Sequence, residues 1–374
     1  MALHRRHCAA LLATLLAAGC AGAPSDDARP PAVKKAPPGQ PFTLLGSGDV
    51  LPHDTVIQQA LDDGGGEAHD FAPMLAGVRP LVSRADVALC HMETVYGPDG
   101  GPFTGYPAFK SPPAVAKGVA DTGYDACSTA SNHSLDDGPE GIMNTLDAMD
   151  AAGLKHAGSG RSKAEAQRPA LLKAGGAKVA QLAYTYGTND IPLPPGKPWA
   201  VNITDPERII ADARAARHAG ADVVAVSMHW GTEWEEQPDS KQRRLADELT
   251  KSGDIDVILG THAHVPQPYE KVNGTWVVYG MGDQVAGAMT NYDGVNDERG
   301  NWSSVARFTF APPRKDGGRW RVSKAEFVPQ LMDLDDMRVR NLGADADGYE
   351  DARDRIREIV LSRGAGKDGL VMGR

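Results

Sequence analysis

Apolar runs alternate with helix-like segments from residue 42 to about residue 330, and this alternation constrains the fold more than any other feature of the chain. It is the pattern of a protein built from strand–helix–strand units. Several of the runs are apolar and β-branched at nearly every position, which indicates strands that are buried on both faces. We therefore expect an α/β domain with strands at residues 42–46, 87–90, 124–128, 179–184, 223–228, 257–259 and 276–279.

The segments between and after these runs complete the expected architecture. Apolar spacing and helix-capping residues predict helices at residues 139–152, 205–219 and 241–251. From residue 303 onward the pattern changes to antiparallel strands, which we expect at 305–310 and 320–328. Residues 349–362 predict a highly charged amphipathic helix, and its narrow apolar stripe indicates packing at the periphery.

Polar side chains follow five of the strand-like runs. The sharpest case is Gly260-Thr261-His262-Ala263-His264, in which two histidines leave one strand two residues apart. Strand ends in an α/β sheet deliver their side chains to one ligand-binding edge. Carboxylate, amide and imidazole groups without a thiolate suit zinc, manganese or iron in a hydrolytic centre. The candidate ligands are Asp49, Glu93, Asn132, His229, His262 and His264.

Each of these groups alone could be structural, since a Gly-Asp pair is often a turn and a single histidine often only forms hydrogen bonds. Five such groups at separate strand ends make a polar centre the better interpretation. Glu93 could bridge two cations with its two oxygens, and His133 would remain free as a general acid. Two divalent ions about 3.5–4 Å apart can activate a water and clamp phosphoryl oxygens.

The first forty residues predict export. Two arginines precede a short apolar stretch that ends in Ala17-Ala18-Gly19-Cys20, the arrangement of a secretory signal peptide. The cleavage region resembles a bacterial lipobox, in which Cys20 would become the lipidated first residue, although an ordinary signal peptide with an incidental cysteine is the alternative. Residues 21–40 are rich in Pro, Ala and Lys and predict a disordered tether. We expect a protein that is lipid-anchored to the cell membrane and faces away from the cytoplasm.

Two further properties limit the interpretation. The formal net charge of −10 argues against broad binding to nucleic acid. Cys90 and Cys127 each end a predicted strand, and they could form a disulfide in an oxidising compartment. We expect free thiols instead, because residues on neighbouring parallel strands rarely meet the geometry of a disulfide.

The same motifs give the chain a resemblance to the bacterial capsule synthesis protein CapA family of poly-γ-glutamate production, which is similar to the calcineurin-like metallophosphatases. The matching stretches are residues 48–49, 85–94, 131–138, 229–233, 260–267 and 278–283. The resemblance implies a four-layer sandwich of two mixed β-sheets flanked by helices. It also implies that the six candidate residues bind divalent metal ions (two of Mn, Fe or Zn), that His133 is the acid, and that Asp136 orients the His133 loop.

The chain departs from the family's pattern at several positions. Leu51 stands where a metallophosphatase has a histidine, so one metal site lacks a ligand, and His53 replaces it only if the loop bends back. His91 and Asp283 stand where the family usually has asparagine. His91 shares a strand face with Glu93, which favours a compensating role as a ligand. Asp283 is a further candidate ligand or an outer residue of the site.

These observations support two functions. The first is a surface-tethered, metal-dependent hydrolase or transferase that acts on an anionic envelope polymer or its phosphorylated precursor, with other membrane-bound synthesis proteins as expected partners. The second is a non-catalytic assembly or anchoring factor that binds the polymer with a degenerate metal site. The expected organisation is a signal peptide at 1–20, the tether at 21–40, the metallophosphatase-like domain at 41–335 and a charged C-terminal helix within 336–374.

Overall fold

The computed structural model describes residues 39–315 and 318–374, which belong to one compact unit, Val33–Arg374. The predicted signal peptide with Cys20, and residues 21–38 of the predicted tether, lie outside the described residues. Within the described part of the chain, no helix has both the length and the apolar character that crossing a membrane requires.

The larger of two main sheets contains both parallel and antiparallel strands. Its central strand β1 runs parallel to β2 and to β13, and antiparallel to β14. Across the described residues the strand order is β16 (Arg338–Asn341), β15 (Arg321–Asp333), β14 (Trp302–Ala311), β1 (Phe42–Leu51), β2 (Val87–Met92), β5 (Ala126–Ser128) and β6 (Lys155–Ala157), with β13 (Asp283–Ala286) beside β1 and β17 (Leu370–Met372) beside β15.

The second main sheet is also mixed. Its order is β11 (Tyr269–Val272), β12 (Thr275–Val278), β10 (Val257–Thr261), β9 (Val223–His229), β8 (Ala177–Thr185) and β7 (Ala170–Ala174). The three strands β8, β9 and β10 are parallel, so their carboxyl ends lie at the same edge. A small pair, β3 (Val95–Tyr96) and β4 (Lys110–Ser111), stands apart from both sheets.

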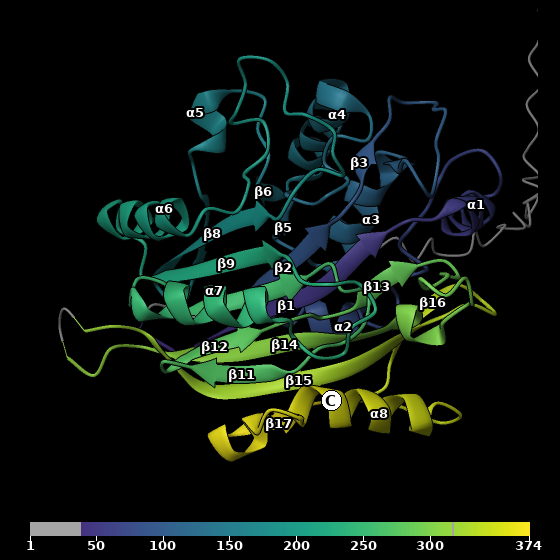
Figure 1. Cartoon of the computed structure of the whole chain (residues 1–374). Coiled ribbons are helices and arrows are strands. Elements are labelled where there is room, and N and C mark those ends of the chain that lie inside the picture. The colour runs from purple at the N-terminus through teal and green to yellow at the C-terminus, as the bar shows by residue number, and fades with distance from the viewer. Residues whose placement is uncertain (1–38, 316–317) are drawn as a thin grey trace, which may run out of the picture. The chain divides into compact units, whose positions relative to one another are not determined.

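Helices cover the outer face of each sheet, and Figure 1 shows α6 and α7 lying across the sheet that contains β8 and β9. Apolar residues of α1, α3 and α4 pack on the sheet that contains β1. The helices are α1 (Asp54–Asp63), α2 (Arg79–Val82), α3 (Ala114–Thr122), α4 (Gly138–Ala152), α5 (Lys163–Ala166), α6 (Pro206–His218), α7 (Ser240–Lys251) and α8 (Glu350–Leu361), with 3-10 turns η1 (Glu298–Asn301) and η2 (Ala365–Asp368).

Strand alternation separates the core into layers. Consecutive residues of a strand point to opposite faces, so Leu44 faces the second sheet while Leu45 faces the outer helices. Ile258 of β10 likewise faces α6 and α7, whereas Leu259 faces the sheet that contains β1. The arrangement of helices, sheet, sheet and helices is the four-layer sandwich that the resemblance predicted.

The C-terminal segment contributes more than the charged helix expected from its sequence. Strands β16 and β17 extend the larger sheet, and α8 lies along β15 (Figure 1). Ile356 and Val360 of α8 are fully buried in the core between the sheets. The narrow stripe of apolar residues therefore closes an end of the sandwich that the six-stranded sheet leaves uncovered.

The expectation of free thiols was wrong, because Cys90 and Cys127 form a disulfide. Strands β2 and β5 pair in a register that sets these two residues directly opposite each other, with their Cα atoms 4.4 Å apart. That separation lies at the lower end of the range for disulfides. The argument from sequence failed because it relied on how rarely neighbouring parallel strands meet disulfide geometry, and the sequence does not reveal the register that brings these two cysteines together.

Candidate metal centre

The candidate site lies where the carboxyl ends of strands from both sheets meet. The larger sheet contributes Asp49 from β1 and Glu93 from the residues after β2, and the second sheet contributes His229 from β9. Pairing fixes their positions, because Asp49 lies opposite both His91 and Asp283, while His229 lies opposite Thr261 just before the two histidines. All of the predicted ligands are buried.

A close approach of two backbone segments aims Asp49 into the site. The Asp49 amide donates to the carbonyl of Gly282 at 3.0 Å, and a Cβ on Gly48 would lie 1.8 Å from the same oxygen. Glycine is therefore required at position 48. The carboxylate of Asp49 in turn accepts a hydrogen bond from the His262 amide at 3.1 Å, which joins the two sheets at the site.

One set of ligand atoms is rich in oxygen. Asp49, Glu93, His264 and Asp283 each place a ligand atom within 4.8 Å of the others. Within this set, His264 Nδ1 lies 3.1 Å from Asp283 Oδ1. Three carboxylates and one imidazole at this spacing can surround a divalent cation.

A second set is rich in imidazole. Glu93, His229 and His262 also have ligand atoms within 4.8 Å of one another, and Glu93 Oε1 lies 3.7 Å from His229 Nε2. The Asn132 amide oxygen lies 2.8 Å from the same nitrogen and could join this set. Glu93 belongs to both sets, which is the position that a bridging carboxylate would occupy.

Several buried atoms at the centre have no hydrogen-bond partner among the described residues. They are Asp49 Oδ1, both carboxylate oxygens of Glu93, Asp283 Oδ2, His91 Nε2 and His262 Nδ1. Buried polar atoms are almost always satisfied, because leaving one without a partner costs about 1–3 kcal/mol. Their concentration at one point is what a site for cations requires, so these residues fit divalent metal ions.

The pKa shifts agree with that interpretation. Burial raises the pKa of Asp49 well above its usual value, and the Asp283 carboxylate raises it further. Burial also raises the pKa of Glu93, with Asp49 adding to the effect. Burial lowers the pKa of His91 to about 3 and that of His229 well below its usual value. Neutral imidazoles offer a lone pair to a cation, and a cation among the crowded acids would favour their ionised forms.

His264 differs from the other histidines of the centre. Burial alone would lower its pKa, but the carboxylates of Asp283 and Glu93 more than offset burial and raise the pKa well above its usual value. A protonated His264 is therefore the positive charge that the protein itself places among these acids. Both His262 and His264 have positive φ angles, 95° and 59°, which non-glycine residues rarely adopt and which cluster at functional sites.

His133 lies beside the centre and is held by Asp136. Its Nδ1 lies 2.6 Å from Asp136 Oδ2, which also accepts a hydrogen bond from the Phe109 amide. The Phe109 ring packs edge-on against the imidazole at 4.8 Å. With Nδ1 fixed in this way, Nε2 is the nitrogen that His133 can present to a substrate.

The two histidines considered as replacements for the missing first-motif ligand lie in different places. His91 shares a set with Asp49 and His229, with its Nε2 3.5 Å from Asp49 Oδ1 and its Nδ1 2.7 Å from Ser128 Oγ. His53 instead places Nδ1 3.0 Å from the Leu51 carbonyl, next to the start of α1, and belongs to none of the sets. The loop does not bend back to bring His53 to the cations.

Glu233, four residues after His229, is a further candidate residue of the site. It forms a third set with His262 and His264, and its Oε1 lies 3.9 Å from His264 Nε2. The Tyr292 hydroxyl donates to its other oxygen at 2.8 Å. An acid four residues beyond a strand-end histidine was the available signal, but only the turn after β9 shows that it folds back toward the site.

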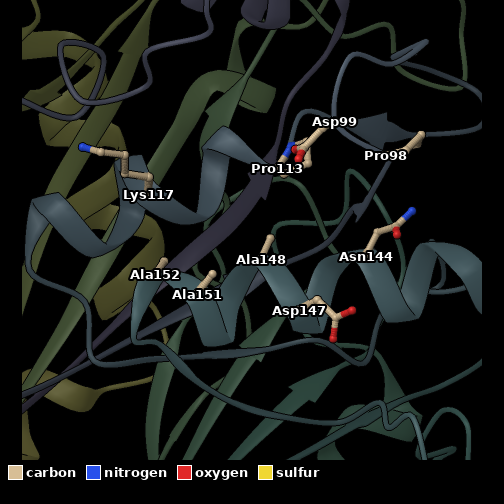
Figure 2. Close-up of a pocket in the computed structure, with 10 residues that line it drawn as sticks. Pro98, Asp99, Pro113, Lys117, Asn144, Asp147, Ala148, Ala151 and Ala152 are labelled. Atoms are coloured by element: carbon tan, nitrogen blue, oxygen red, sulfur yellow. The ribbon is translucent and has the colours of Figure 1, made fainter.

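A cavity of about 420 Å³ opens beside the centre. His133, Glu233 and His264 are among its lining residues, and aromatic side chains form much of the rest; the lining also includes Tyr106, Phe109, Trp234, Met289 and Tyr292. Figure 2 shows a larger cavity of about 580 Å³ between α3, α4 and the loop at residues 97–99. None of its lining residues belongs to the metal-ligand sets, so the smaller cavity is the one that serves the centre.

Comparison with known proteins gives a family match over most of the domain. The sequence profile described as bacterial capsule synthesis protein PGA_cap matches residues 43–288. A PGA biosynthesis protein CapA from Bacillus subtilis is 32% identical over 178 residues, 45% of this chain and 44% of that protein. A probable polyglutamine synthesis accessory protein from Mycobacterium tuberculosis is 29% identical over 225 residues, 56% of this chain and 57% of that protein. The chain thus spans about half the length of the curated relatives it matches.

Solved structures show weaker similarity. A calcineurin-like phosphoesterase, YfkN, from Bacillus subtilis is 15% identical, with a TM-score of 0.47 over 86% of this chain and 100% of that one. The NAD nucleotidase of Haemophilus influenzae is 14% identical, with a TM-score of 0.45 over 89% of this chain and 57% of that one.

Proposed function

Because this chain belongs to the PGA_cap family of bacterial capsule synthesis proteins, we propose that it acts on an anionic envelope polymer such as poly-γ-glutamate, or on its phosphorylated precursor, as a metal-dependent hydrolase or transferase. The observation that carries the proposal is the cluster of buried carboxylate and imidazole atoms without hydrogen-bond partners among the described residues. A purely structural cluster would satisfy these atoms internally.

The proposed chemistry divides between the cations and His133. Divalent cations held by the two ligand sets would act as Lewis acids and lower the pKa of a water molecule. His133 lines the cavity, and Asp136 holds its Nδ1. It is therefore placed to donate a proton through Nε2 to a leaving group.

The lining of the cavity supports dependence on cations for substrate binding. Neither lysine nor arginine occurs among its described lining residues, and Glu233 adds a negative charge. Without cations, an acidic substrate would find no lysine or arginine among these lining residues to pair with. We infer that the anionic group of the substrate faces the metal ions, while its uncharged part contacts the aromatic residues Tyr106, Trp234 and Tyr292.

Metal analysis and a substrate panel test the proposal together. The purified domain should contain divalent metal, and with that metal it should release phosphate from phosphoesters or amine from γ-glutamyl amides. The variant Glu93→Gln is the matched inactive control, because it removes one charge from the centre while keeping the shape of the side chain. Release at equal rates by both proteins would show that the activity comes from elsewhere.

The alternative function is non-catalytic binding of the polymer. It is favoured by Leu51, which stands where the related enzymes have a histidine ligand. In that case the polymer would bind to the loaded centre and remain intact. Retention of polymer by the metal-loaded protein, with no product from any member of the panel, would select this alternative.

The cellular setting is part of the same proposal. The lipobox-like sequence before Cys20 supports a lipid anchor on the outer side of the cell membrane, and the residues after it support a tether. Such an anchor would hold the centre close to membrane-bound proteins that make the polymer. Pull-down experiments on the membrane fraction can identify these proteins and the polymer.

A further inference from the structure

Leu51 stands where a metallophosphatase has a histidine ligand, so the cation site that contains Asp49 is one ligand short. The structure offers a replacement on a different strand. We propose that Asp283 supplies the missing ligand, so that Asp49, Glu93, His264 and Asp283 together hold one cation. The inference rests on the metal centre of the proposed function, but it does not depend on which reaction that centre catalyses. It assigns a specific role to an aspartate at a position where the family usually has asparagine.

The pairing of β1 with β13 explains how Asp283 reaches the site. Asp49 and Asp283 lie opposite each other on these two parallel strands, and both side chains are fully buried. Leu51, two residues further along β1, lies opposite Ala286 and lines the cavity instead. The neighbouring strand therefore supplies a carboxylate directly beside Asp49.

Asp283 fits this role better than His91 does. Asp283 has a ligand atom within 4.8 Å of those of Asp49, Glu93 and His264, whereas the set that contains His91 includes Asp49 but neither Glu93 nor His264. The Nδ1 atom of His91 is also engaged already, because it forms a hydrogen bond with Ser128 Oγ. Its stacking on His229, with ring centroids 4.8 Å apart, indicates that His91 supports that ligand.

If Asp283 only oriented His264, that role would account for only one of the two carboxylate oxygens of Asp283. Oδ1 lies 3.1 Å from His264 Nδ1, but Oδ2 is buried and has no hydrogen-bond partner among the described residues. The carboxylate can thus hold the imidazole with one oxygen and offer the other to a cation. Asparagine could perform the first task equally well, which separates the two roles experimentally.

Charge balance supports the same assignment. The three buried carboxylates of Asp49, Glu93 and Asp283, with the half-buried Glu233 of the neighbouring set, carry four formal negative charges. Two divalent cations would match this charge. The proposal also makes the two sites unequal. Three carboxylates and one imidazole favour a hard cation such as Mn²⁺, whereas Glu93 with His229 and His262 suits Zn²⁺ better.

The test compares the wild-type domain with Asp283→Asn by equilibrium dialysis against Mn²⁺ and, separately, Zn²⁺, followed by elemental analysis. Asparagine keeps the shape of the side chain and can still accept from His264 Nδ1, but it removes the charge. Asp63→Asn serves as the control, since this carboxylate pairs with Arg338 and belongs to no ligand set. Circular dichroism verifies that both variants fold.

We expect the wild type and Asp63→Asn to bind two Mn²⁺ and Asp283→Asn to bind one, with at least about a tenfold loss of affinity at the other site, because even outer residues of metal sites contribute 10–100-fold. Binding of two Mn²⁺ by Asp283→Asn with unchanged affinity would overturn the inference, as would loss of that cation in His91→Asn but not in Asp283→Asn. A wild type that binds two cations and turns over no substrate would refute the proposed enzymatic function and leave the assignment of Asp283 standing.

Discussion

Replacing Glu93 by glutamine should remove the stabilisation by both cations at once, because Glu93 belongs to both ligand sets. A cation at one hundred times its dissociation constant stabilises a folded protein by about 2.7 kcal/mol. The melting entropy is about 2.1 cal/mol/K per residue, so for the compact unit Val33–Arg374 it is about 0.7 kcal/mol/K in total. Each cation should therefore raise the melting temperature of the wild type by about 4 °C, and two by about 8 °C.

The variant should gain much less. If losing this shared ligand weakens each site about 100-fold, the same cation concentration stabilises Glu93→Gln by only about 0.4 kcal/mol per site, or about 1 °C for both sites together. Differential scanning calorimetry with excess Mn²⁺ or Zn²⁺, against a chelated sample, measures the difference. A gain of about 4 °C or more in the variant would show that Glu93 is not shared between two sites.

Without metal, the same substitution should have the opposite effect. Burial, and then the Asp49 carboxylate, raise the pKa of Glu93 above its ordinary value of 4.5. A group of this kind contributes stability below its unfolded pKa and loses that contribution as the pH rises through its folded pKa. In chelator, Glu93→Gln should therefore melt near the wild type at pH 4 and above it at pH 8. Glu326→Gln is the control, because Arg307 and Lys324 hold the pKa of Glu326 low against the effect of burial, so this variant should lose stability at neutral pH.

Further predictions concern the remaining residues of the site and the anchor. His262→Ala and His264→Ala should each lower metal affinity by more than about tenfold, measured by equilibrium dialysis, and full occupancy in the double variant would contradict the assignment. His133→Asn should keep its metal and reduce turnover by about 10²–10⁴-fold, whereas wild-type turnover with metal retained would make His133 structural. Cys20→Ala should shift the protein out of the membrane fraction, and an intact mass showing unmodified Cys20 in the wild type would refute lipidation.

The fold could be predicted largely because buried parallel strands have a distinctive sequence. The nine expected strands correspond to β1, β2, β5, β8, β9, β10, β12, β14 and β15, and the four expected helices correspond to α4, α6, α7 and α8. Short elements escaped prediction. Strand β13 has only four residues, and its Asp283 and Gln284 give it no apolar pattern, yet pairing with β1 buries it completely.

The candidate site was predictable to the extent that strand ends carry its residues. The structure brings together all six candidate ligands, and it places Asp136 against His133, but their roles as ligands and acid remain predictions. From the sequence, His91 and Asp283 could not be told apart as candidates to replace the missing histidine. Alternation along β2 describes His91 alone, whereas Asp283 lies 234 positions after Asp49 and reaches it only because β13 pairs with β1. Glu233 could not be placed from the sequence either, because a turn rather than a strand brings it to the site.

The hydrogen bond from the His262 amide to Asp49 joins residues 213 positions apart. Contacts of such long range form late, since the entropy of closing the intervening chain must be overcome before they can be made. The imidazole-rich set is complete only after residue 262 has been synthesised, and the oxygen-rich set only after residue 283. Any metal loading would therefore follow the docking of β10 and β13 against β1, and the cations acquired would be those available in the compartment where that docking takes place.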